Sequence, residues 1–378
     1  MSMAKVLAEN GHNVTVVTSL KPHVTHRNLN HIYVPLTEKE HAAHEASIAN
    51  MTERDNSNMF RALFHMRKEI YIANNINFNV MKNQRVRDLY ENKDNKFDLV
   101  MVGFCFNNFQ IGIAQKLKVP VVVATSMFPS KIFDPMLGDI QTQSYVPSMF
   151  LSMGKGQVMS LLQRIKNYQT ISMIEIIRYL IDIDNANYYQ QLYGDDPTMP
   201  KYEELNKNVS LVLFNSHSLS EGPIRPNFPG AIEVGGIQIK EKPDPLPKPI
   251  ADFLQNAEKM VKDGFGLSMS LLTLEEKPFH DNIKEVLDNP KYTEKVKAFS
   301  QLFRDRPLTA RQTVLYWVEY VLRHHGAAHL QSPLVHMSFI EANNLDIYAL
   351  LIFFIAVVWV LFKLVFKFLN HFKPNSDY

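Results

Sequence analysis

The sequence predicts an α/β fold built around one doubly wound parallel sheet, and two patterns support this prediction. Short, continuously apolar runs rich in Val and Ile alternate, over residues 1–240, with longer segments of helical periodicity. Strands of a parallel sheet are buried on both faces, so they are continuously apolar rather than alternating. The intervening segments are long enough for crossover helices on both faces. We therefore expect ligands to bind at the carboxyl ends of the strands.

The expected strands are short β-branched runs bounded by Gly, Pro, Asn or Asp, and they comprise residues 14–18, 31–36, 97–103, 120–124, 209–214 and 231–234. The expected helices carry apolar stripes, and they comprise residues 1–10, most of 38–92, 109–117 and 157–193. Residues 126–152 contain three prolines and are predicted to form a loop that contributes methionines to the core or to a pocket lining.

After this unit, four prolines in residues 243–249 indicate a stiff, extended linker. Short helices are expected at 251–261, 278–287 and 291–303, with one weak strand candidate at 266–271. A better specified helix follows: Thr309 and Gln312 have the spacing of a capping box, and Gly326 suits the left-handed position after the last turn.

Near the C-terminus, residues 347–362 are uninterrupted apolar sequence, and the helix reaches the thickness of a bilayer if it continues past Lys363 to residue 366. Acidic residues precede this segment and lysines follow it. The positive-inside rule therefore predicts a membrane-spanning helix at 347–366, after a spacer at 334–346 and before a cytosolic tail at 367–378.

Composition excludes several classes of function. The net charge is +2 without a basic run outside the tail, so no nucleic-acid partner is predicted. Cys105 is the only cysteine, which excludes an internal disulfide and a cysteine-based metal site. His324, His325 and His329 are more typical of helix termination than of metal binding. We therefore predict neither a metal nor a cofactor.

Residues 302–333, LFRDRPLTARQTVLYWVEYVLRHHGAAHLQSP, followed by an apolar segment, resemble the C-terminal end of membrane-anchored UDP-glycosyltransferases, the family that contains the UDP-glucuronosyltransferases. The run PGAIEVGGI at 229–237 resembles the junction between the two domains of that family. The resemblance implies a GT-B-like fold and the transfer of a hexosyl or glucuronosyl group from a UDP-sugar, a co-substrate, to a small lipophilic acceptor.

The resemblance also implies a donor-side domain with a Ser/Thr-His-Gly-Gly loop and a later Asp-Gln pair, and neither motif occurs in this sequence. We expect most of that domain to be missing at a join near residues 253–262. The predicted organisation is an acceptor-side domain without its first strand at 1–240, the linker at 241–250, and a helical remnant of the donor-side domain at 251–333.

By the same resemblance, the catalytic histidine would lie before Met1, and the acid that orients it would fall near Gly103. Asn107 and Asn108 are the nearest polar candidates for that position, but neither carries charge. His23 and His26 follow the first predicted strand and are candidates for a replacement base. His12 precedes that strand and is not a candidate.

Three functions stay open at this level. In the first, the chain retains sugar transfer. In the second, it is a shortened, non-catalytic form that either pairs with full-length relatives or is degraded. In the third, it is an unrelated anchored helical protein. We expect the endoplasmic reticulum membrane as its location, with a single pass and the tail in the cytosol. Because no signal peptide is visible, insertion after synthesis, with the body in the cytosol, is the competing topology.

Overall fold

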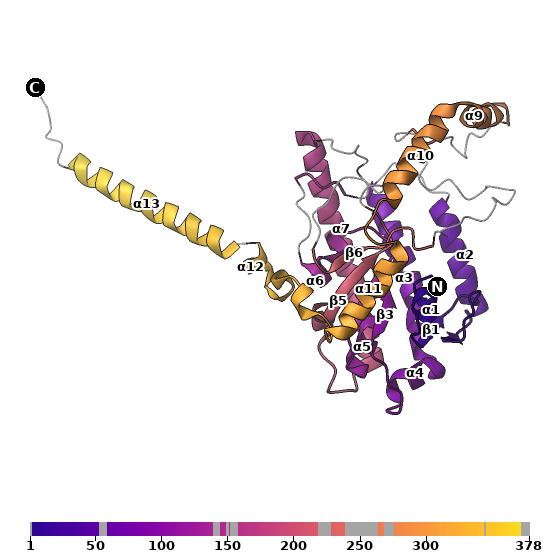
Figure 1. Ribbon diagram of the computed structural model, residues 1–378. Helices are drawn as coiled ribbons and strands as arrows, with labels where there is room; N and C mark the ends of the chain where they lie inside the picture. The colour runs from indigo at the N-terminus through magenta and orange to yellow at the C-terminus, as the bar shows by residue number, and fades with distance from the viewer. Residues whose placement is uncertain are drawn as a thin grey trace, which may run out of the picture. The chain divides into compact units, whose positions relative to one another are not determined.

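The computed structural model has the α/β fold that the sequence predicts (Figure 1). The chain divides into two compact units, Met1–Gln331 and Ser332–Tyr378. The domain boundaries predicted inside these units stay predictions. The structure describes residues 2–52, 59–138, 144–148, 151, 158–217, 228–238, 264–267, 276–343 and 345–371.

Within the described part of the first unit, six strands form two sheets in which every neighbouring pair is parallel. One sheet pairs β1 (Val14–Thr18) with β2 (Leu29–Tyr33). The other has the order β3-β4-β5-β6 and consists of β3 (Val100–Gly103), β4 (Val121–Thr125), β5 (Val209–Phe214) and β6 (Ala231–Glu233). All six lie where the sequence predicts strands, although β2 begins and ends earlier than expected.

Helices connect these strands. Between β1 and β5 the structure has α2 (Glu38–Thr52), α3 (Met59–Lys82), α4 (Gln84–Glu91), η1 (Asn108–Ile111), α5 (Gly112–Leu117), η2 (Lys131–Phe133), α6 (Asp134–Leu137), α7 (Leu161–Tyr193) and η3 (Tyr202–Asn208). The region predicted as a loop at 126–152 thus contains two short helical segments. Asp134 and Pro135 occupy the first turn of α6, where proline is tolerated because its missing N–H would have no partner there.

Two apolar cores lie on opposite faces of the four-stranded sheet. Val121 and Val123 of β4 belong to a core beneath α3, α4 and α7, whereas Val122 belongs to a second core. The second core is covered by α1 (Ser2–Glu9) and α11 (Ala310–Arg323), the orange helix in Figure 1. The sheet is therefore covered by helices on both faces, as a doubly wound fold requires.

The C-terminal helices of the first unit follow the sequence pattern closely. α9 (Glu276–Asp288) and α10 (Pro290–Arg304) lie at two of the predicted positions, and η5 (Ala328–Leu330) follows α11. Thr309 and Gln312 form the predicted capping box of α11, and Gly326 has a φ of 102°. The expected helix at 251–261 lies outside the described residues, as does most of the strand candidate at 266–271.

The second unit contains η6 (Pro333–His336), α12 (Phe339–Ala342) and α13 (Leu345–His371). Residues Leu345–Leu364 of α13 are long and apolar enough to cross a membrane, and none of this window is buried within the structure. The Lys363 ammonium lies 3.7 Å from the centroid of the Trp359 ring. The candidate span agrees with the predicted membrane helix to within two residues at each end.

Candidate functional site at the carboxyl edge of the sheet

The turn after β3 contains the residues predicted for the orienting acid. Gly103 ends β3 and is exposed, and a Cβ atom added to it would meet no atom within 4 Å. The amide of Asn107 is fully engaged: its Oδ1 accepts from the Cys105 N–H at 2.6 Å, and its Nδ2 donates to the Gly103 carbonyl at 2.9 Å and to Gln110 Oε1 at 2.5 Å. Asn107 therefore stabilises the turn, and its catalytic role stays a prediction.

Asn108 begins η1 and connects this turn to a neighbouring element. Its Nδ2 donates to Asn206 Oδ1 in η3 at 2.8 Å, and its side chain is 8% exposed. In the present conformation the amide group joins two short helices instead of facing an open site. Its role at the position of the orienting acid stays a prediction.

Two buried asparagines fix the same turn from the helical layer. Phe106 has a φ of 61°, in the left-handed region, and its carbonyl accepts from Asn74 Nδ2 in α3 and from Asn185 Nδ2 in α7, both at 2.8 Å. The two amides also bond to each other at 3.2 Å. Because buried polar groups need partners, this network specifies the conformation of the turn.

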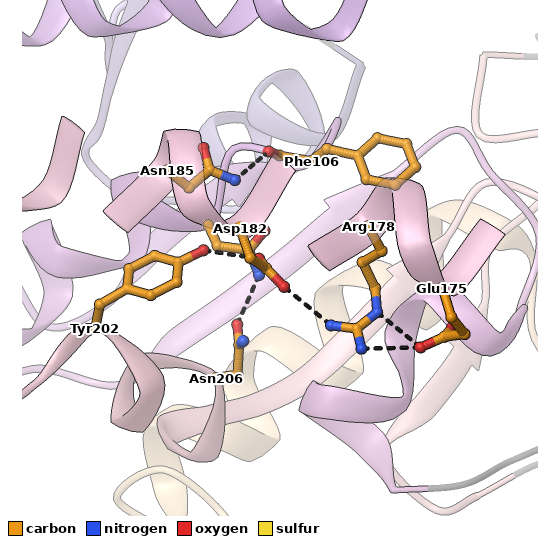
Figure 2. A network of polar contacts seen from close by, with 8 residues as sticks. Phe106, Glu175, Arg178, Asp182, Asn185, Tyr202 and Asn206 are labelled. Atoms are coloured by element: carbon orange, nitrogen blue, oxygen red, sulfur yellow. Dashed lines mark hydrogen bonds and ion pairs between the residues drawn. The ribbon is translucent and has the colours of Figure 1, made fainter. Parts of the chain in front are cut away.

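A charged network on α7 lies next to these amides (Figure 2). Arg178 donates to Glu175 Oε2 at 2.9 Å and to Asp182 Oδ2 at 2.9 Å. Tyr202 of η3 donates from its hydroxyl to Asp182 Oδ1 at 2.9 Å. Burial raises the pKa of Asp182, against the hydrogen bond from Tyr202 and the charge of Arg178, which lower it. Both carboxylate oxygens of Asp182 are occupied, which favours a positioning role for this residue.

The sequence analysis missed these polar residues, although a signal for the asparagines was present. Asn185 continues the apolar stripe of Ile177 and Ile181 at a spacing of four, and Asn74 lies at the same spacing between Ile70 and Phe78. A polar side chain within an apolar stripe indicates a buried group that requires a specific partner.

Of the two histidines proposed as replacement bases, His26 does not lie at the carboxyl edge. His26 Nδ1 accepts from the Asn28 N–H at 3.3 Å, and the Asn28 carbonyl accepts from the Val14 N–H at the first residue of β1. His26 therefore lies near the amino end of the sheet. His23 is exposed in the preceding loop. His12 Nε2 lies 3.3 Å from Glu319 Oε1 of α11.

One histidine that the sequence analysis did not single out does lie at the carboxyl edge. His217 follows β5 by three residues and is 8% exposed, and its ring centroid lies 4.5 Å from that of Phe303 at the end of α10. The sequence signal was its position directly after a buried strand. This contact brings the segment that contains FRDRP to the carboxyl edge of the sheet.

Arg306 of that segment contributes a cation near the same edge. Its guanidinium lies 4.5 Å from the centroid of the Phe303 ring, and its Nε donates to the Phe303 carbonyl at 3.0 Å. Burial lowers the pKa of Arg306, while the charge of Glu233 at the end of β6 raises it. A half-buried arginine, an imidazole and a carboxylate are suited to bind a polar ligand.

Two further groups of polar side chains make contacts within the described residues. The Tyr320 hydroxyl lies 2.7 Å from His329 Nε2, and no group of three or more His, Cys, Asp or Glu side chains that could hold a metal is present within the described ranges. Asp195 lies in a turn, and Asp196 beside it pairs with Lys116.

Comparisons with known proteins indicate the family of the chain. The model of the UDPGT family, UDP-glucoronosyl and UDP-glucosyl transferase, matches residues 1–258 and 249–374. UDP-glucosyltransferase 2 of Dactylopius coccus is 23% identical over 487 residues, which cover 100% of this chain and 91% of the relative. UDP-glycosyltransferase UGT4 of the same species is 21% identical over 470 residues, 96% of this chain and 90% of the relative.

A third relative matches a shorter part of the chain at higher identity. UDP-glucuronosyltransferase 1A9 of Mus musculus is 32% identical over 113 residues, 30% of this chain and 21% of the relative. No solved structure matches the chain. Since the family model covers nearly the whole sequence, the chain belongs to the UDP-glucuronosyl and UDP-glucosyl transferase family.

Proposed function

We propose that this chain is a membrane-anchored family member that does not transfer sugar on its own. The observation that carries the proposal is the lack, in the printed sequence, of the Ser/Thr-His-Gly-Gly loop and the Asp-Gln pair that the family resemblance implies for the donor side. Sugar transfer needs a site that holds the nucleotide diphosphate, commonly at a helix N-terminus. Without that site, a hexosyl or glucuronosyl donor would not be positioned for attack by an acceptor hydroxyl.

Two further observations support a missing donor segment. The family match consists of two segments that meet at 249–258, beside the join expected at 253–262. The alignment with UDP-glucosyltransferase 2 spans 487 positions, while this chain supplies 378 residues, so the relative contains segments without a counterpart here. Among the described residues between 264 and 331, the regular secondary structure is helical and no strand is present.

Isothermal titration calorimetry with UDP tests the donor site without assuming an acceptor. The full chain in detergent micelles should give no binding heat, whereas UDP-glucosyltransferase 2 of Dactylopius coccus, prepared in the same way, should bind. Membranes that contain the chain should also transfer no radiolabel from UDP-glucose or UDP-glucuronic acid to a panel of phenols. Transfer above a mock preparation would contradict the proposal.

The second candidate is a non-catalytic subunit that pairs with full-length relatives. It is favoured by the separation, in the described residues, of the sheet of β1 and β2 from the four-stranded sheet. Unpaired strand edges are sites where another chain can add a strand. A tagged full-length relative co-expressed with this chain should co-purify with it. Loss of the chain with a short half-life, without any bound relative, would favour degradation instead.

We also propose that the chain is a single-pass protein of the endoplasmic reticulum membrane, with its tail in the cytosol. Glu341 and Asp346 precede α13, and Lys363, Lys367 and Lys373 lie at its other end, which supports this orientation. In this orientation Asn208, exposed in a glycosylation sequon, is available for modification. A mobility shift on glycosidase treatment that is lost in Asn208→Gln would support it. Protease digestion of the body in sealed microsomes would contradict it.

A further inference from the structure

Helix α7 is apolar on two opposite faces, and only one of them is covered. Ile174, Ile177 and Ile181 are buried in the core of the first unit. A surface helix of a globular protein normally has polar and charged side chains opposite its buried face. On that side α7 instead presents large apolar side chains that are 44–77% exposed, here called the α7 stripe: Leu161, Leu162, Ile165, Tyr168, Ile176, Tyr179 and Ile183.

The spacing of these side chains places them on one continuous surface. From Leu161 to Ile183, successive members along the helix are three or four residues apart when Ser172 is counted between Tyr168 and Ile176. Residues at this spacing lie above one another on the same side of a helix. At 1.5 Å per residue, the α7 stripe is about 33 Å long.

The area of the α7 stripe exceeds that of an ordinary apolar surface patch. At on the order of 100 Å² for each side chain, the stripe exposes roughly 700 Å², whereas the largest apolar patch on a typical monomer is about 300–600 Å². Its side chains are also as exposed as the large apolar side chains of the candidate membrane span in α13, which are 38–69% exposed. A patch of this size indicates an interaction surface.

The acidic groups of α7 are neutralised within the first unit. Arg178 forms ion pairs with Glu175 and with Asp182, both at 2.9 Å. Asp184 pairs with Arg67 of α3, also at 2.9 Å. These three carboxylates are the only ones in the sequence of α7. The helix therefore offers no unpaired negative charge to a partner of the stripe.

Two cations of α7 are not neutralised in this way. Arg164 and Lys166 are exposed, lie on either side of Ile165 in the sequence, and have no ion pair among the described residues. Unpaired cations beside exposed apolar side chains are typical of helices that lie in the headgroup region of a membrane. The rings of Tyr168 and Tyr179 suit the same region, where tyrosine is enriched.

We propose that the α7 stripe lies in the headgroup region of the bilayer that α13 spans, as a second membrane contact of the chain. A spanning α13 would keep the first unit close to a lipid surface, so that even a weak contact is populated. Anionic lipid headgroups would complement Arg164 and Lys166. Self-association through the stripe fits less well, because α7 has no unpaired carboxylate for these cations. The inference rests on the proposed anchoring, but it is independent of UDP binding and sugar transfer.

Brominated lipids, which quench nearby tryptophan, test the contact on the full chain in nanodiscs that hold one chain each and contain about 30% phosphatidylserine. Native Trp359 lies in the candidate span, so its quenching reports the insertion of α13. In a Trp359→Phe background, with the signal of Trp317 subtracted, Tyr168→Trp should lose about half of its fluorescence. Tyr33→Trp on β2, the control at another exposed tyrosine, should lose less than about a tenth.

These reporters separate failure of the inference from failure of the proposed anchoring. Quenching of Trp359 without quenching of Tyr168→Trp would leave the anchoring intact and overturn the second contact. Absence of quenching at Trp359 would contradict the anchoring and the inference together. A dimer in micelles, combined with an unquenched Tyr168→Trp in single-chain nanodiscs, would assign the stripe to a second copy and also overturn the inference.

The lipid composition tests the contribution of charge. Replacement of phosphatidylserine by phosphatidylcholine should reduce the quenching of Tyr168→Trp at least about twofold. The pair of changes Arg164→Gln and Lys166→Gln should cause the same reduction while phosphatidylserine is present. Lys93→Gln with Lys96→Gln, a control that removes two exposed lysines after α4, should cause none. Equal reductions in the two double variants would contradict the proposal.

A charge placed within the stripe tests the contribution of apolar contact. Ile165→Glu should reduce the quenching of Tyr168→Trp at least about threefold, because a carboxylate resists transfer into the lipid interface. Leu20→Glu, the control at an exposed apolar residue after β1, should have no effect. Circular dichroism verifies that both variants are folded. Equal quenching in the two folded variants would contradict the proposal.

Discussion

β1 and β5 have similar apolar sequences, VTVVT and VSLVLF, but very different surroundings. Every residue of β5 is buried and the strand pairs with β4 and β6, whereas every residue of β1 is half-buried and, among the described strands, β1 pairs with β2 alone. Composition therefore identifies a strand of a parallel sheet but not its neighbours. The difference also indicates where stability is concentrated in the first unit, namely in the four-stranded sheet.

Hydrogen exchange should show the largest difference between the four-stranded sheet and the sheet of β1 and β2. The amides of Val122 and Val123 in β4 should exchange about a thousandfold or more slowly than those of Thr15 and Val17, because the former open only with the core of the unit. Val16, whose N–H faces β2 like that of Val14, serves as the control within β1. Mass spectrometry with electron-transfer fragmentation resolves single amides. Equal protection of Val16 and Val17 would show that both edges of β1 are paired.

Aromatic truncations should separate the two sheets by stability. Phe214 of β5 is fully buried and packs edge-on against Phe133 with ring centroids 4.8 Å apart. Phe214→Ala should lower the free energy of unfolding by about 3–5 kcal/mol, because it leaves a cavity. Tyr33→Ala on β2, where the side chain is 36% exposed, should cost less than about 1 kcal/mol. Urea denaturation followed by circular dichroism measures the free energy of unfolding of both variants. A similar loss in the two variants would contradict the difference in stability between the two sheets.

These contrasts also show what could be predicted from the sequence. All six strands and the capping box of α11 were predicted because continuous apolar runs and cap spacing are local signals. The separation of the two sheets depends on hydrogen bonds between distant segments, so no local pattern reveals it. The candidate residues Gly103, Asn107 and Asn108 are close in the sequence and lie in one turn after β3, and their role stays a prediction. The contact between His217 and Phe303 joins segments far apart in the chain, so it has no local signal.

Removal of a buried amide should have an intermediate effect. Asn185→Ala deletes a donor to the Phe106 carbonyl and a partner of Asn74, and Asn185 is fully buried, so the variant should lose about 1–3 kcal/mol of unfolding free energy. Asn30→Ala on β2 removes an exposed bond to Asn13 and should cost less than about 0.5 kcal/mol. Chemical denaturation of both variants tests the prediction. If Asn30→Ala lowered the unfolding free energy as much as Asn185→Ala does, side-chain hydrogen bonds would stabilise the sheet of β1 and β2 as strongly as the turn after β3.

The smallest effect should be a pH dependence at the ion pair that ties α5 to the segment after α7. The hydrogen bond from Lys116 holds the pKa of Asp196 well below its usual value, and bonds from Thr198 act in the same direction. The folded state therefore binds this proton more weakly than the unfolded state does, so the stabilisation is present above the unfolded pKa of about 3.9 and is lost as the pH falls below it.

Asp196→Asn should lower the Tm slightly at pH 6, and the difference from the unmodified chain should shrink towards pH 3. Asp195→Asn, at an exposed neighbour without an ion pair in the described residues, should show no such trend. A difference for Asp196→Asn that grows as the pH falls would reverse the sign and exclude the ion pair with Lys116 as its cause.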